Sequence, residues 1–303
     1  MNVLVAGASG AIGRPLVAEL IRRGHMVTGM TRSDAGAKAL AALGATVARV
    51  SALDADAVGR AMKEARAEVV IDELTALPAD PSRMSDAAAG DRKLRLEGGG
   101  NLHRTALACG ARRYIQQASG FFLRPGPGLG DESEGMAVDA SPRIADHART
   151  YAELESRVLG AEGIEGVAMR YGFFYGPGTW YHQEGASADQ VRRGEFPIIG
   201  DGEGVWSWVH IDDAAVATAD ALTIPPGAYH IVDDDPSPVA LWLPAFARFV
   251  GGPPPPHVTV EQALASAGED AVYYGTKLRG ASNAKAKETF GFLPRRQEWL
   301  RTP

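Results

Sequence analysis

Cysteine is almost absent from this chain of 303 residues, in which Cys109 is the only one. A single cysteine forms no internal disulfide and excludes a cysteine-based metal site. The seven histidines include no His-x-x-x-His pair, so we expect no bound metal. Cys109 lies in an alanine-rich helical stretch, where a small core residue is the expected role.

Long apolar runs and an excess of positive charge are absent as well. No run is long enough to span a bilayer, and the first strand begins so early that we expect no signal peptide. A net charge of -6 argues against a nucleic-acid or anionic-membrane partner. We therefore expect a cytoplasmic protein, monomeric or homodimeric, that acts on a small molecule.

Strand and helix patterns alternate over the first 170 residues of the sequence. Short apolar strands are predicted at Val3–Val5, His25–Thr31, Ala45–Val50, Glu68–Asp72, Arg113–Ala118 and Gly166–Arg170. Helices are predicted at Ile12–Arg23, Ala35–Leu43, Ala55–Arg66, Ala87–Cys109 and Ala145–Glu162. This alternation implies right-handed crossovers and a doubly wound parallel Rossmann sheet, with ligands beyond the carboxyl ends of the strands.

The pattern loosens after Arg170. Glycine, proline and aromatic residues interrupt Tyr171–Trp180, and Pro253–Pro256 marks an exposed connection. We therefore predict an α/β fold with a smaller C-terminal α/β substrate lobe. The cofactor-binding domain is expected to span 1–170, with 206–232 returning to it, and the lobe to span 171–205 and 233–303.

A glycine-rich turn joins the first strand to the first helix. Gly7, Gly10 and Gly13 follow the spacing of a dinucleotide fingerprint, with a strand before it and a helix after it. Outward N–H groups and the helix dipole favour a pyrophosphate there. The expected contacts come from this turn: Gly7, Ser9, Gly10, Ala11, Ile12 and Gly13.

The second strand ends without the carboxylate that usually binds the adenosine 2′-hydroxyl in NAD-binding proteins. Arg32 is placed to pair with a 2′-phosphate, and Thr31 and Ser33 add hydroxyl donors. We therefore expect NADP (NADPH) as cofactor rather than NAD. Asp34 is expected to cap the next helix, and Asp54 either lies beside the adenine or caps a helix itself.

Five motifs in order resemble the extended short-chain dehydrogenase/reductase superfamily, which includes the NAD-dependent epimerases and dehydratases. They are the glycine turn, Gln117–Ser119, Arg170–Gly178, Gly200–Glu203 with Trp208–Asp213, and Ala281–Lys287 with Phe290–Pro294. The resemblance implies that Ser119 is an active-site residue and that Asn101 is structural. It also suggests that Leu74, Thr75, Ala76, Tyr171 and Phe173 lie along the cofactor.

The family's catalytic Tyr-x-x-x-Lys pair is missing. Either Tyr151 is the acid and Glu155 replaces the lysine, or His147 stands at the tyrosine position and Tyr151 at the lysine position. The distance to Arg170 favours the second alignment. His147 and Tyr151 are four residues apart and share one helix face. The predicted catalytic residues are thus Ser119, Tyr151 and His147.

Aromatic residues after the fifth and sixth strands suggest a flat, apolar substrate pocket. Its predicted lining is Phe121, Phe174, Tyr175, Trp180, Tyr181, His182 and Trp206. We expect an NADP-dependent oxidoreductase that reduces a carbonyl or conjugated double bond of a small, hydrophobic or aromatic compound, such as a secondary metabolite. Two alternatives stay open: a non-redox lyase, isomerase, cyclase, epimerase or dehydratase on the same scaffold, and a non-catalytic NADP-sensing regulator.

Overall fold

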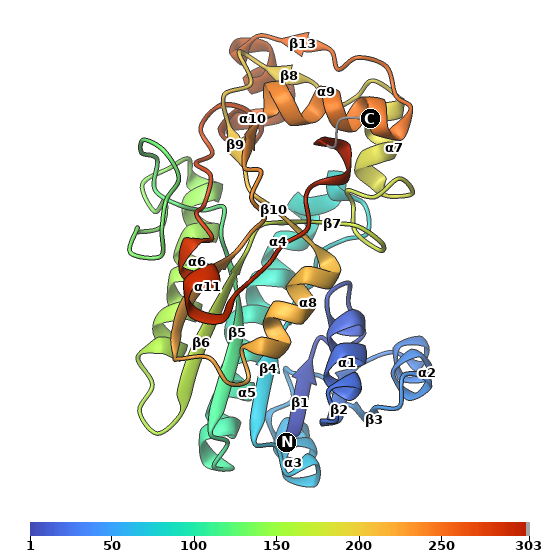
Figure 1. Cartoon of the computed structure of the whole chain (residues 1–303), viewed down its shortest axis with the longest axis vertical. Coiled ribbons are helices and arrows are strands. Elements are labelled where there is room, and N and C mark those ends of the chain that lie inside the picture. Colours follow the sequence, from blue (N-terminus) through green and yellow to red (C-terminus); the bar gives the residue numbers. More distant parts are fainter. Residues whose placement is uncertain (301–303) are drawn as a thin grey trace.

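Short buried strands from the first 231 residues form one parallel sheet in the larger half of the molecule (Figure 1). The structure is a computed structural model that describes residues 1–300. In spatial order the strands are β11 (Gly227–Ile231), β6 (Glu165–Tyr171), β5 (Arg113–Ser119), β4 (Val69–Asp72), β1 (Asn2–Ala6), β2 (Met26–Thr31) and β3 (Thr46–Arg49). The order reverses beside β1, so the predicted doubly wound Rossmann sheet is confirmed.

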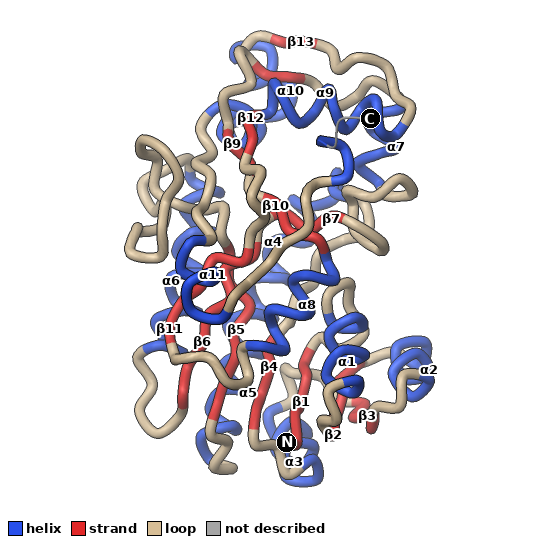
Figure 2. Tube along the Cα trace, in the orientation of Figure 1, coloured by secondary structure: helices blue, strands red, loops and turns tan. Residues whose placement is uncertain are grey.

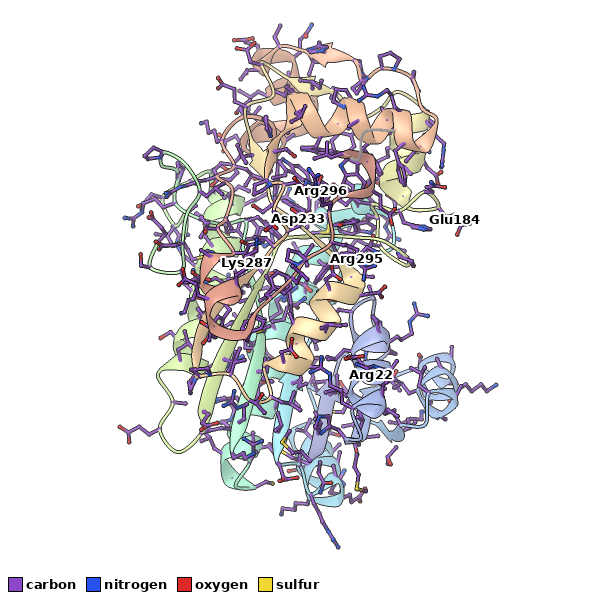
Figure 3. The ribbon with its side chains drawn as sticks, in the orientation of Figure 1. Arg22, Glu184, Asp233, Lys287, Arg295 and Arg296 are labelled. Atoms are coloured by element: carbon purple, nitrogen blue, oxygen red, sulfur yellow. The ribbon has the colours of Figure 1, made fainter. Side chains whose placement is uncertain are left out.

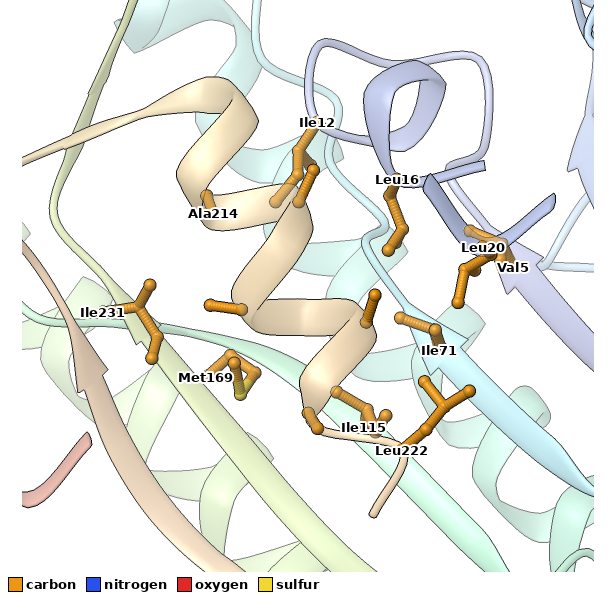
Figure 4. Packing of buried hydrophobic residues seen from close by; sticks show 14 of the residues in the cluster. Val5, Ile12, Leu16, Leu20, Ile71, Ile115, Met169, Ala214, Leu222 and Ile231 are labelled. Atoms are coloured by element: carbon orange, nitrogen blue, oxygen red, sulfur yellow. The ribbon is translucent and has the colours of Figure 1, made fainter. Parts of the chain in front are cut away.

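Helices cover both faces of this sheet. One face carries α1 (Gly13–Arg22), α2 (Asp34–Ala42), α8 (Ile211–Asp220) and α11 (Ala284–Phe290). The other carries α3 (Ala55–Ala65), α5 (Gly99–Ala108) and α6 (Pro142–Leu159). Figure 4 shows α8 lying over Ile71, Ile115 and Met169, whose fully buried side chains fill the space between helix and sheet. Each such side chain stabilises the fold by roughly 1.5–3 kcal/mol.

The long helix expected at Ala87–Cys109 is divided. Helix α4 (Met84–Lys93) runs into a π-helical turn, Leu94–Gly98, and α5 follows. The glycines at 98–100 allow close packing here, since a Cβ on Gly99 would lie 2.7 Å from Oδ2 of Asp72. The π turn also directs Arg95 into the interior, where its side chain is only 4% exposed.

The smaller lobe is held together by aromatic side chains. Its elements are β7 (Phe173–Tyr175), α7 (Ala186–Arg192), β8 (Ile198–Ile199), β9 (Val205–Trp206), β10 (Trp208–His210), β12 (Ser237–Pro238), α9 (Val239–Val250), β13 (His257–Val258) and α10 (Val260–Thr276). The strands are short and pair only in twos (Figure 2). Trp208, Trp242 and Phe246 are fully buried and form the centre of the lobe's core.

The chain passes between the two halves several times. After β10 it returns to the sheet as α8 and β11, enters the lobe again, and comes back as α11. The expectation that 233–303 stays in the lobe is wrong for α11: Ala286 is buried in the sheet's core, and the Lys285 ammonium donates to the carbonyl of Ala228 at 2.8 Å. Beyond α11, Arg295 lies near the junction of the two halves (Figure 3) and binds the Asp213 carboxylate.

No helix within residues 1–300 has the length and apolar character needed to cross a bilayer. The same residues contain no group of three or more His, Cys, Asp or Glu side chains arranged to hold a metal ion.

Candidate active site

The glycine turn is shaped by close backbone contacts. Gly7 has a φ of 76°, and a Cβ there would lie 2.3 Å from the carbonyl oxygen of Glu73. A Cβ on Gly13 would lie 2.2 Å from the carbonyl oxygen of Gly7. Gly10 and Ala11 are exposed, and the first turn of α1 carries no acidic residue. This backbone fits a dinucleotide pyrophosphate, because a flat, uncharged turn lets phosphates reach the helix N-terminus.

Two arginines converge at the end of the sheet where the adenosine is expected. Arg32 and Arg49, with Val50 and Ser51, line one open surface cavity. Arg49 also pairs with Asp34 at 2.7 Å, but both side chains are largely exposed, so solvent weakens this pair. The cavity therefore presents positive charge and a hydroxyl beyond the end of β2.

Three of the predicted cofactor contacts, Thr31, Ser33 and Asp54, also form hydrogen bonds within the protein. The Thr31 side chain is buried and its hydroxyl bonds that of Ser9 at 3.0 Å, which ties β2 to the glycine turn. Ser33, not Asp34, caps α2, and its hydroxyl oxygen accepts from the N–H of Gly36. Asp54 caps α3 by accepting from Ala57 at 3.0 Å. The Ser33 hydroxyl acts only as an acceptor in this cap, so its proton can still be donated to a ligand.

The loop after β4 is held in place by buried carboxylates. Asp72 accepts from the N–H of Leu74, and Asp91 accepts from the N–H of Ala76 at 2.6 Å. Leu74, Thr75 and Ala76 stay partly exposed, as a segment beside a cofactor must. Glu73 points the other way, where its carboxylate accepts from the hydroxyl of Tyr171 at 2.8 Å.

Tyr171 has no surface through which its ring can meet a cofactor. The side chain is 2% exposed, and its hydroxyl bonds both Glu73 and Thr218. The predicted cofactor contact by this side chain needs correction, because β6 directs it into the core between the sheet and α8. Phe173, two residues later, stays partly exposed.

His147 and Tyr151 do share a face of α6, and both line one cavity. The ring of Phe122 lies 5.6 Å from that of His147 and 5.7 Å from that of Tyr151. Glu155, one turn further on, is turned away and is bound by Arg170 through two hydrogen bonds of 2.7 Å. A carboxylate held in this way does not stand beside Tyr151 as a substitute for lysine, which supports the alignment with His147 and Tyr151 as the pair.

Burial governs the protonation of both residues. It raises the pKa of the Tyr151 phenol, although the nearby Arg95 guanidinium opposes that rise. It lowers the pKa of His147, while Asp270 and Asp91 oppose the change. At neutral pH both groups are therefore uncharged.

Ser119 ends β5 and is 1% exposed. Its hydroxyl oxygen accepts weakly from the N–H of Phe121 at 3.4 Å. Side chains alternate along a strand, so Ser119 points to the same face as Gln117, about 6.6 Å further along. Ile115, Met169 and Tyr171 lie on this same face, in the core beneath α8. The longer Gln117 side chain nevertheless reaches Arg95 at 2.9 Å.

The predicted aromatic lining divides into two groups. Tyr175, Tyr181 and Trp206 are buried in the lobe's core, and Phe174 packs against the core of the sheet. Tyr175, Tyr181 and Trp206 thus pack the lobe, whereas Phe174 stays partly exposed. Phe121, Trp180 and His182 are partly exposed. Phe173 stacks between Phe121 at 4.2 Å and Trp206 at 4.0 Å, forming a continuous aromatic wall.

Sequence reasoning missed the buried charges beside Tyr151. Arg95 lies with its guanidinium 5.1 Å from the centre of the Tyr151 ring and binds Asp91 at 2.7 Å. It comes from a π turn, a feature often found at functional sites, which no sequence period reveals. Arg49 could have been noticed, since parallel pairing sets the end of β3 beside Thr31.

Comparisons with known proteins agree with this geometry. The model of the NAD dependent epimerase/dehydratase family matches residues 3–231. A 3-diazoavenalumate denitrifying reductase from a Streptomyces species is 40% identical over 302 residues, which cover 99% of this chain and 98% of the relative. The chain belongs to the NAD dependent epimerase/dehydratase family. It is an NAD(P)-dependent enzyme of the short-chain dehydrogenase/reductase type, and an oxidoreductase.

A second relative, the 2-alkyl-3-oxoalkanoate reductase of Stenotrophomonas maltophilia (strain K279a), is 28% identical and covers 84% of this chain and 77% of its own. Two solved structures share the fold. A UDP-glucose 4-epimerase of Thermus thermophilus with NAD has a TM-score of 0.76 and 24% identity, covering 99% of this chain and 96% of its own. A dTDP-glucose 4,6-dehydratase of Streptomyces venezuelae with NAD has a TM-score of 0.77 and 18% identity, covering 98% of this chain and 93% of its own.

Proposed function

We propose that this chain is an NADPH-dependent reductase that replaces the diazo group of a small, conjugated organic acid by hydrogen. The nicotinamide supplies a hydride to the carbon that carries the diazo group, the carbon–nitrogen bond breaks, and dinitrogen leaves with the bonding electrons. In its diazonium form the substrate R–N₂⁺ plus NADPH gives R–H, N₂ and NADP⁺. The name of the relative that is 40% identical suggests this substrate class.

The observation that carries the proposal is the helix face of α6, which offers no lysine beside Tyr151 and has Glu155 bound to Arg170. Carbonyl reduction ends with a proton delivered to an alkoxide, and the family's tyrosine–lysine pair serves that step. Loss of dinitrogen needs no such proton. A site without the pair is therefore suited to hydride replacement.

NADPH is proposed over NADH because of the cavity formed by Arg32, Arg49 and Ser51. Guanidinium groups bind a phosphate through charge-assisted hydrogen bonds, and no carboxylate stands at the end of β2 to accept from a 2′-hydroxyl. The partly exposed, stacked rings of Phe121 and Phe173 support a flat, conjugated substrate.

Carbonyl reduction is the second candidate. The Tyr151 hydroxyl makes no hydrogen bond with residues 1–300 and lines the cavity, so it is available as a donor to a substrate oxygen. The name of the second relative points to the same reaction, on a 3-oxoalkanoate. The two candidates give different products, so one assay separates them.

The test uses 3-diazoavenalumate labelled with ¹⁵N in the diazo group, and NADPH carrying deuterium at C4. We expect one labelled dinitrogen per NADPH oxidised, measured by mass spectrometry, and deuterium at the carbon that carried the diazo group. Gly10→Val, designed to lose the cofactor, controls for spontaneous reduction. NADPH oxidation with a panel of 3-oxo acids, without release of dinitrogen from the diazo acid, would instead establish carbonyl reduction.

A further inference from the structure

A cavity of about 190 Å³ lies between α4 and α6. Its lining combines candidate catalytic residues with charged side chains that the proposed hydride transfer does not use. The lining residues are Ala88, Ala89, Asp91, Arg92, Arg95, Arg143, Asp146, His147, Thr150 and Tyr151.

Arg95 is a buried cation with an unmet hydrogen-bonding capacity. Its Nε donates to Asp91 Oδ2 at 2.7 Å and its Nη1 donates to Gln117 at 2.9 Å. Its Nη2 makes no hydrogen bond with any residue from 1 to 300. The side chain is 4% exposed and borders the cavity. A buried guanidinium gains most from an acceptor that fills its remaining donor positions, above all an anionic oxygen.

The charges around the cavity favour an anion. Asp91 is engaged by Arg95 and by the N–H of Ala76. Arg143 is neutralised by Asp270 at 2.9 Å. Arg92 is exposed and forms no ion pair within the described part of the chain. Asp146 is paired with Arg149. The lining therefore keeps one excess positive charge, that of Arg92.

We infer that this cavity binds the carboxylate of the substrate, with Arg95 and Arg92 as its cationic partners and the Tyr151 hydroxyl as a further donor. The inference rests on the proposed function, which supplies an organic acid as substrate. The conjugated part of the acid would then extend along Phe122, whose ring lies beside both His147 and Tyr151. The helix face that performs acid–base work elsewhere in the family here holds the substrate's charged end.

Binding, measured without turnover, tests this inference. The probes are trans-cinnamate and its neutral amide, titrated calorimetrically into protein saturated with NADP⁺. We expect the amide to bind about 10- to 100-fold more weakly, the range of a lost hydrogen bond between charged groups. Arg92→Ala should weaken cinnamate by a smaller factor, about two- to fivefold, because Arg92 is exposed and solvent screens its charge, and should leave the amide unchanged. Lys93→Ala is the matched control, because Lys93 is the exposed neighbour of Arg92 and does not line the cavity.

Arg95 is tested together with its partner, since Arg95→Met alone would strand a buried carboxylate. The double variant Asp91→Asn with Arg95→Met should fold and lose the preference for cinnamate over the amide. Equal affinity for acid and amide in the unaltered protein, or unchanged cinnamate affinity in both variants, would overturn the inference. Carboxylate binding without dinitrogen release would overturn only the proposed reaction. Dinitrogen release with equal efficiency from the diazo acid and its amide would overturn only the carboxylate site.

Discussion

Arg170 of β6 binds the carboxylate of Glu155 of α6 through two parallel hydrogen bonds of 2.7 Å, with both side chains buried. The pair joins the helix that carries His147 and Tyr151 to the sheet that carries Ser119. It thus fixes how the helix face is presented to the rest of the site.

Removing one partner should be costly, because the other is left charged in the interior. We expect Glu155→Leu to lower the free energy of unfolding by about 3–5 kcal/mol, measured by urea denaturation. Adding Arg170→Met should restore part of that loss. If the double variant is as unstable as the sum of the two single variants, the pair is not coupled.

Gly10 and Gly13 of the turn should respond differently to substitution. Gly13→Ala should destabilise the fold, because a Cβ would overlap the carbonyl of Gly7. At Gly10 the nearest atom to a Cβ is 3.1 Å away and the residue is exposed. We therefore expect Gly10→Val to melt at nearly the original temperature but to lose dinucleotide binding in calorimetry. Full affinity in this variant would place the pyrophosphate elsewhere.

Cofactor preference should depend on the two arginines of the adenosine cavity. Arg32→Ala and Arg49→Ala should each weaken NADPH binding by about 1–3 kcal/mol, the loss of a charged hydrogen-bond partner. NADH, which lacks the 2′-phosphate, should bind as before. Titration of both cofactors against each variant gives the comparison, and equal losses for NADPH and NADH would contradict the assignment.

Tyr151 gives a test of whether the reaction uses a protein acid. If dinitrogen is the leaving group, Tyr151→Phe should raise KM for the diazo acid roughly tenfold, the loss of one hydrogen bond to a charged oxygen, and leave kcat nearly unchanged. A proton donor would instead cost roughly 10²–10⁴-fold in kcat. If a protein group donates the proton, kcat should also decline as pH rises through the pKa of that group.

That decline would begin in mildly acidic solution for His147, whose pKa is lowered by burial. For Tyr151, whose pKa is raised by burial, it would begin only in strongly alkaline solution. We expect kcat to stay flat between these limits.

Glu73 should make stability depend on pH. Burial is the main cause that raises the pKa of its carboxyl to about 8, and one carboxylate oxygen has no partner within residues 1–300. The folded state therefore holds the proton more tightly than the unfolded chain does, whose carboxyl pKa is near 4.5. Stability is consequently lost as pH rises from about 4.5 to 8.

Glu73→Gln removes this proton equilibrium. The difference in melting temperature between Glu73→Gln and the unaltered protein should shift in favour of the variant as pH rises from 5 to 8. The exposed Glu64 provides the control, since Glu64→Gln should leave the pH profile unchanged. If the melting temperatures of Glu73→Gln and the original protein change with pH in the same way, this carboxylate is already ionised in the folded state.

Local patterns predicted the sheet well, because a buried parallel strand is a short apolar run that ends in a turn. Each of the first six strands lies within about two residues of its predicted position. The π turn at Leu94–Gly98 was not predicted, since one extra residue in a helix leaves no periodic trace. The return of α11 was missed too, because its burial depends on Tyr229, which is distant in sequence.

The candidate site was predictable where backbone geometry dictates the residue, as at Gly7 and Gly13. It was less predictable where long side chains meet across elements. Arg95 of the π turn reaches Gln117 of strand β5, and no spacing in the sequence connects them. Aromatic residues were overassigned to the pocket, because a Trp that fills a core and a Trp that lines a cleft look alike in sequence.

The repeated passage of the chain between the two halves has a consequence for protein engineering. The substrate lobe is assembled from segments that flank α8 and β11, and α11 follows the last of its long helices. No single pair of cuts would excise the lobe while leaving the sheet whole. A grafted lobe from a relative would have to bring α8, β11 and α11 with it, and of these α8 packs against α1, beside the cofactor turn. New substrate preference is therefore more accessible through point changes in the cavity walls than through exchange of modules.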